Sequence, residues 1–78
     1  MDVKAAENKI TILRVPSYSP EAVAEFAMAM LLTINRMTHK AYSRTREFNM
    51  SLNGLMGTNL YEKTAGVVGT GKIGQAMI

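Results

Sequence analysis

The sequence contains no cysteine and no tryptophan, and it has one histidine among its 78 residues. Without cysteine there can be no disulfide framework, and the lone His39 gives no ligand cluster of the structural zinc type. The longest unbroken apolar run, residues 26–32, is far shorter than the roughly 20 residues that cross a bilayer. We therefore expect no metal site, no membrane partner and a cytoplasmic location.

The charges of the sequence do not indicate a nucleic-acid-binding surface. The net charge is +3 and aromatic residues make up 6% of the chain. The basic residues form no long run, and aromatic side chains do not alternate with them as they do on a nucleic-acid stacking surface. We expect no nucleic-acid partner. A hydrophobic content of 47% with seven methionines is typical of a globular protein with an aliphatic core.

The first third of the chain predicts a strand followed by a helix. Residues 10–15 are rich in β-branched side chains and end at Pro16, which favours a short strand. Ser19 is a suitable helix N-cap, Pro20 suits the first helical position, and Glu21 suits the positive end of the helix dipole. The sequence therefore predicts a helix that begins at Pro20.

A single long helix is predicted over residues 20–48, because no glycine or proline interrupts residues 21–48. Residues 22–32 are apolar on nearly every side, whereas the second half is basic and amphipathic. Nothing else in the sequence offers enough apolar surface to cover the first half. We therefore expect cover from a second subunit or from residues outside this sequence, and a chain that is part of a longer protein.

The last third of the chain predicts a phosphate-binding turn. Residues 49–59 suit a loop, residues 63–68 suit a strand, and Gly69, Gly71 and Gly74 follow in the dinucleotide spacing before a helix begins. The first glycine permits the turn, the second lets a pyrophosphate approach the backbone, and the third permits close packing. The acidic residue that separates NAD from NADP stands about 20 positions further on, past the last residue, so both remain open.

Three blocks of this sequence, in this order and spacing, resemble D-lactate dehydrogenases of the D-isomer-specific 2-hydroxyacid dehydrogenase family. The resemblance covers nearly the whole chain. It departs from close relatives at Met1, at Phe26 where a histidine is common, and at Glu62 where a glycine is common. The matching blocks are residues 14–25, residues 35–46 and residues 63–74.

The resemblance implies an α/β fold, a partial doubly wound (Rossmann-type) dinucleotide-binding domain with a long N-terminal interdomain helix. Residues 1–19 would form the interdomain crossing with its short strand, residues 20–48 the interdomain and dimer helix, and residues 49–78 the start of the NAD-binding domain. The resemblance also implies a homodimer or larger assembly through the long helix.

The resemblance assigns site residues as well. Gly69, Gly71 and Gly74 with Lys72 and Ile73 would bind NAD. Tyr18 matches a tyrosine that lies near the substrate carboxylate in the family. The family's catalytic arginine, glutamate and histidine lie downstream of the glycine turn, so we expect no catalytic residue in this chain. His39, on a basic part of the predicted helix, receives no chemical role.

The expected function is therefore that of a fragment of an NAD-dependent D-2-hydroxyacid dehydrogenase that interconverts a small 2-oxo acid such as pyruvate with D-lactate. We expect the chain alone to be inactive. Two alternatives stay open at this point. The chain could be a standalone nucleotide-binding module, which saturable NADH binding would favour, or an interaction fragment that pairs through its long helix.

Overall fold

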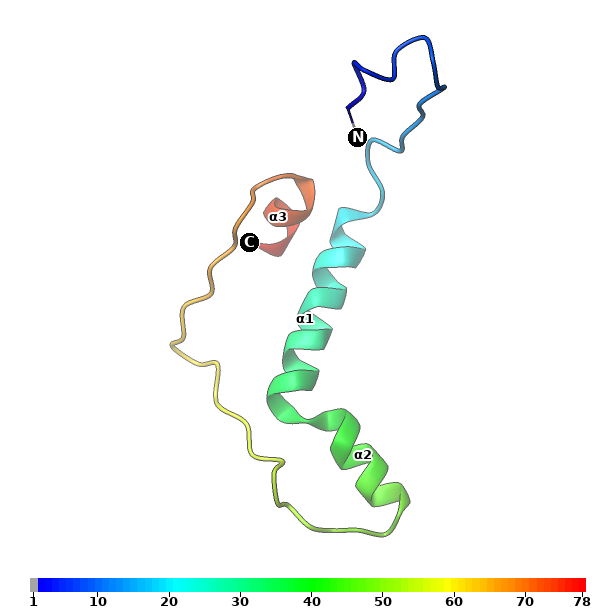
Figure 1. Cartoon of the computed structure of the whole chain (residues 1–78). Coiled ribbons are helices and arrows are strands. Elements are labelled where there is room, and N and C mark those ends of the chain that lie inside the picture. The colour runs from blue at the N-terminus through cyan, green and yellow to red at the C-terminus, as the bar shows by residue number, and fades with distance from the viewer. Residues whose placement is uncertain (1) are drawn as a thin grey trace.

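The computed structural model describes residues 2–78, which form an elongated molecule of 62 × 33 × 19 Å. The described residues contain three helices, α1 (Pro20–Arg36), α2 (Thr38–Arg46) and α3 (Lys72–Met77). Helices α1 and α2 follow one another along a bent arm, and the chain then returns beside this arm to place α3 next to the first half of α1 (Figure 1). The fold thus brings the glycine turn back to the start of α1.

The predicted single helix over residues 20–48 is wrong, because the helix is interrupted at Met37. This residue is left-handed, with φ 53° and ψ 35°, and it separates α1 from α2, which itself ends at Arg46. Helix-forming propensity offers no reason for the break. The adjacent Asn35 and Arg36 side chains instead bond to the returning chain, and tertiary contacts of this kind override propensity.

The start of α1 is at Pro20, as predicted, and Glu21 lies in the first turn. Ser19 is the N-cap residue, as predicted, but its side chain makes no capping hydrogen bond. Capping residues usually have an extended backbone, whereas Ser19 is left-handed with φ 38° and ψ 64°. Its main-chain carbonyl oxygen accepts from the amide of Ala22 at 3.1 Å instead.

Neither predicted strand is formed within residues 2–78. Residues 10–15 and 63–68 have no ladder partner there, and Val68 is fully exposed. A strand is defined by hydrogen bonds to a neighbouring strand, so a suitable pattern of side chains does not produce one by itself. The strands of the predicted α/β fold therefore stay a prediction.

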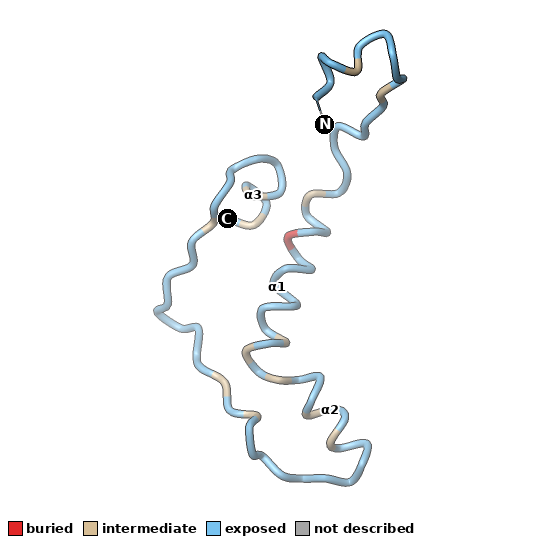
Figure 2. The backbone as a smooth tube through the Cα atoms, viewed as in Figure 1, coloured by how far each residue is buried: buried red, intermediate tan, exposed pale blue. Residues whose placement is uncertain are grey.

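Ala24 in α1 is the one buried residue among the described ones, with 5% of its surface exposed (Figure 2). Apart from Ala6 and Ile12 near the N-terminus, the half-buried residues lie in two regions. One lies where α3 meets the first half of α1 and includes Pro20, Val67, Gly74 and Met77. The other includes Thr33, Asn35, Met37, Ala41, Arg44, Leu55 and Gly57, at the junction of the helices with the returning chain.

None of the helices in the described part of the chain combines the length and the apolar character needed to cross a membrane. No group of three or more histidine, cysteine, aspartate or glutamate side chains in residues 2–78 is arranged to hold a metal ion.

Candidate cofactor site

The glycine turn leads directly into α3. Gly69 is left-handed with φ 98°, where a side chain would be strained, and Gly71 is the N-cap of α3. Gln75 closes the turn twice: its side-chain amide donates to the carbonyl oxygen of Thr70 at 2.9 Å, and its main-chain amide donates to that of Gly71 at 2.8 Å. The amides at the start of α3 have no partner within the helix, as at any helix N-terminus.

Gly71 and Gly74 differ in the space around them. A Cβ atom at Gly74 would overlap the main-chain carbonyl oxygen of Gly69, so the start of α3 packs directly on the backbone of the turn. A Cβ atom at Gly71 would meet no heavy atom within 4 Å. Space beside Gly71 is therefore open to a ligand, and this geometry fits a pyrophosphate that approaches the backbone.

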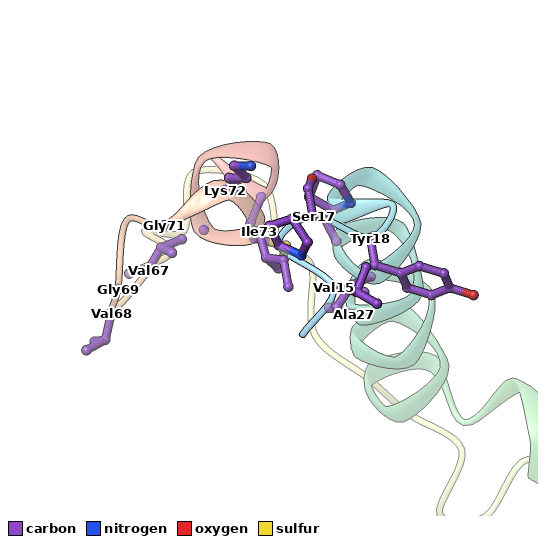
Figure 3. A pocket seen from close by; sticks show the side chains of 17 residues that line it. Val15, Ser17, Tyr18, Ala27, Val67, Val68, Gly69, Gly71, Lys72 and Ile73 are labelled. Atoms are coloured by element: carbon purple, nitrogen blue, oxygen red, sulfur yellow. The ribbon is translucent and has the colours of Figure 1, made fainter. Parts of the chain in front are cut away.

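A cleft of 880 Å³ lies between the glycine turn and the start of α1. Its walls come from residues 15–18, from the first turns of α1, from residues 66–69, and from Gly71 and α3 (Figure 3). The structure thus brings residues far apart in sequence to a single cleft. All predicted site residues line it, namely Tyr18, Gly69, Gly71, Lys72, Ile73 and Gly74.

The lining is mostly apolar, and Lys72 is its one charged residue in the described part of the chain. Lys72 is the first residue of α3, so a positively charged residue stands at the positive end of the helix dipole. This arrangement is favourable for an anionic group such as a phosphate. Ile73 is 47% exposed and faces the cleft between the turn and the crossing segment (Figure 3).

Tyr18 lines the cleft, but its ring extends away from the glycine turn (Figure 3). The residue is 81% exposed. The structure therefore does not bring its hydroxyl group together with Lys72 and Ile73. A substrate contact by Tyr18 stays a prediction.

The other sequence-based expectations can also be located. His39 is exposed on α2, outside the cleft, and its carbonyl oxygen accepts from the Ser43 hydroxyl at 3.1 Å. Sequence reasoning did not identify Val23 and Ala27 of α1 as cleft-lining residues. The one sequence signal was the apolar first half of this helix. It predicted that another part of the protein covers the helix, but it did not identify that part.

The part of the chain that contains the glycine turn matches a known protein family. Residues 28–78 match the model of the D-isomer specific 2-hydroxyacid dehydrogenase, NAD binding domain. The chain belongs to this family. The match includes the whole glycine turn, and the cofactor named by the family description is NAD. This agrees with the resemblance expected from the sequence.

Known relatives agree with the family match. The chain is 57% identical to the D-lactate dehydrogenase of Escherichia coli over 79 aligned positions, which cover all of this chain and 24% of that protein. It is 56% identical to a 2-hydroxyacid dehydrogenase homolog of Haemophilus influenzae, with the same coverage. The chain thus spans about a quarter of the length of the curated relatives that it matches.

Solved structures show the same arrangement of elements. The apo-structure of D-lactate dehydrogenase from Escherichia coli superposes with a TM-score of 0.81, over 97% of this chain and 24% of that one. Salmonella D-lactate dehydrogenase gives a TM-score of 0.77 at 56% identity. Both likenesses support the Rossmann-like character of the domain.

Proposed function

We propose that this chain supplies the first part of the cofactor site and the adjoining crossing segment of an NAD-dependent D-2-hydroxyacid dehydrogenase that interconverts pyruvate and D-lactate. The observation that carries the proposal is the single cleft in which the glycine turn faces the segment around Tyr18. Such a cleft could place a cofactor beside a substrate. The 57% identity to D-lactate dehydrogenase supports the choice of substrate.

The proposed roles of the residues follow from their chemistry. Gly71 leaves room for the cofactor pyrophosphate, and Lys72 and Ile73 contact NAD at the start of α3. Tyr18 contributes to the binding of the substrate carboxylate. NAD, when bound, supplies the hydride chemistry, and these residues orient the cofactor and exclude water from one side of it. No residue of this chain is assigned a catalytic proton transfer.

The partner proposal concerns the outer face of α1. Phe26 is 64% exposed and Ile34 is 66% exposed, so α1 retains a large apolar surface after α3 has packed against it. We propose that this surface meets a second copy of the parent protein. Cytoplasmic location and the absence of nucleic-acid and membrane partners remain expectations from composition alone.

A hybrid enzyme tests the proposed function. It consists of the Escherichia coli D-lactate dehydrogenase in which the matched quarter is replaced by this chain, and the assay is pyruvate-dependent oxidation of NADH. The expected result is turnover within about tenfold of the Escherichia coli enzyme, which corresponds to 1.4 kcal/mol in the activation free energy. A folded hybrid without turnover would contradict the proposal.

The isolated 78-residue chain provides the matched control, and we expect it to show no turnover above background. Turnover by the pure chain would show that the chemistry lies within it. Saturable micromolar binding of NADH by the isolated chain, without turnover, would favour the alternative of a standalone nucleotide-binding module.

A further inference from the structure

The segment between α2 and the glycine turn is attached to the helical arm by polar side chains. Arg44 donates from Nη1 to the main-chain carbonyl oxygens of Ser51 and Asn53, at 3.0 and 2.6 Å. Further along, Arg36 Nη2 donates to Asn59 Oδ1 at 2.9 Å. The returning chain is therefore fixed near residues 51–53 and again near residues 57–59.

Asn35 makes the most specific of these attachments. Its Nδ2 donates to the carbonyl oxygen of Thr58 at 2.7 Å, and its Oδ1 accepts from the amide of Thr58 at 3.0 Å. The carboxamide thus pairs with both main-chain groups of one residue, as a neighbouring strand would. The Thr58 hydroxyl adds a third bond to the same Oδ1 at 3.2 Å.

The neighbouring Gly57 lies directly on the end of α1. A Cβ atom at this position would overlap the carbonyl oxygen of Asn35 and would stand 3.2 Å from its Oδ1. Any side chain at position 57 would therefore push the chain away from α1 and separate the Asn35–Thr58 pair. Asn35 and Gly57 are both half-buried, in a molecule where most residues are exposed.

The position of this attachment gives it a consequence for the cofactor site. Apolar packing fixes little here, because Ala24 is the one buried residue among residues 2–78 and it lies at the other end of α1. The chain from residue 60 to the glycine turn makes no ladder with a neighbour in that range. The direction in which it leaves α1 is therefore set mainly at residues 57–59.

We propose that Asn35, seated against Gly57, is a positioning residue for the cofactor site. By holding both main-chain groups of Thr58, it sets the path along which residues 60–68 deliver the glycine turn to the cleft beside Tyr18. Its influence on NAD binding is indirect and rests on the proposed function, whereas its influence on the path of the chain does not.

The first test measures the path in the full 78-residue chain. The sequence has no cysteine, so spin labels can be placed on single introduced cysteines at Lys40 of α2 and Val68, both exposed. The distance distribution between the labels is then measured by double electron–electron resonance. We expect one narrow distribution for the parent chain, and a broad or displaced one for Asn35→Ala and Gly57→Ala.

Two variants act as matched controls. Thr58→Val removes the hydroxyl but leaves both main-chain bonds to Asn35, so we expect the parent distribution. Asn53→Ala removes an amide side chain from the same segment while leaving the carbonyl oxygen that Arg44 contacts, and we again expect no change. Asn35→Asp keeps the acceptor but places a carboxylate oxygen against the Thr58 carbonyl, and it should behave like Asn35→Ala.

The second test uses the hybrid enzyme. Asn35→Ala is expected to raise KM for NADH about tenfold, the factor that corresponds to the loss of a net 1.4 kcal/mol, with kcat changed less than twofold. Unchanged distances in Asn35→Ala, or a broad distribution already in the parent chain, would overturn the proposal. A hybrid without activity would contradict the proposed function alone, because the label distances still decide the role of Asn35.

Discussion

Gly71 and Gly74 should respond to the same substitution in opposite ways. At Gly74 an alanine Cβ would overlap the carbonyl oxygen of Gly69, which is backbone and cannot turn aside as a flexible side chain can. Overpacking of this kind costs about 1–3 kcal/mol. At Gly71 the new methyl group would meet nothing within 4 Å, and φ of −70° is ordinary for alanine, so the fold should tolerate it.

For NADH binding, unlike for stability, Gly71→Ala should have the larger effect of the two substitutions. The methyl group of Gly71→Ala would occupy the open space in which the pyrophosphate is expected. We predict a dissociation constant for NADH at least tenfold higher, which corresponds to a loss of about 1.4 kcal/mol in binding free energy. In Gly74→Ala the loss of stability should appear first, as a lower melting temperature. The decrease should be about 2–4 °C for each kcal/mol, the value for a domain of about 150–250 residues.

The assay is a thermal melt and an NADH fluorescence titration of the hybrid enzyme carrying each variant, with Asn53→Ala as the control for both. The opposite result would be a Gly71→Ala variant that melts as early as Gly74→Ala while it binds NADH as tightly as the parent hybrid. Either that result or an unchanged stability of Gly74→Ala would refute the prediction.

Three further predictions concern the hybrid enzyme. Lys72→Ala should raise the dissociation constant for NADH by about two- to fivefold, as expected for one exposed charge, and high salt should reduce the difference; a fluorescence titration checks both. Tyr18→Phe should raise KM for pyruvate and leave NADH binding unchanged, and steady-state kinetics would refute a substrate role if neither constant moved. Met37→Gly should stabilise the protein by about 1 kcal/mol, because glycine adopts the left-handed conformation without strain; an unchanged melting temperature beside a Met37→Ala control would count against this.

Much of the site could be predicted from the sequence because its signals are local. The start of α1 at Pro20 follows from its fixed φ, and the helix after Gly71 follows from the glycine spacing. The resemblance predicted both the family and its cofactor NAD, and the family match agrees with both. These features depend on residues that are neighbours in the sequence, or on blocks of sequence that keep the same order and spacing as in the family.

The break at Met37 could not be predicted in this way. The residues just before it, Asn35 and Arg36, bond to Thr58 and Asn59, which are 23 residues away. Propensity over residues 20–48 carries no information about such contacts. Ser19 stands at the predicted N-cap position, but its side chain makes no capping bond because its backbone is left-handed and not extended.

We propose that the glycine turn of this chain binds NAD within a D-2-hydroxyacid dehydrogenase. Equilibrium titration of the hybrid enzyme with NADH tests it most directly, with folding checked by circular dichroism. We expect saturable binding with a dissociation constant within about tenfold of that of the Escherichia coli enzyme. A folded hybrid that does not bind NADH would contradict the proposal.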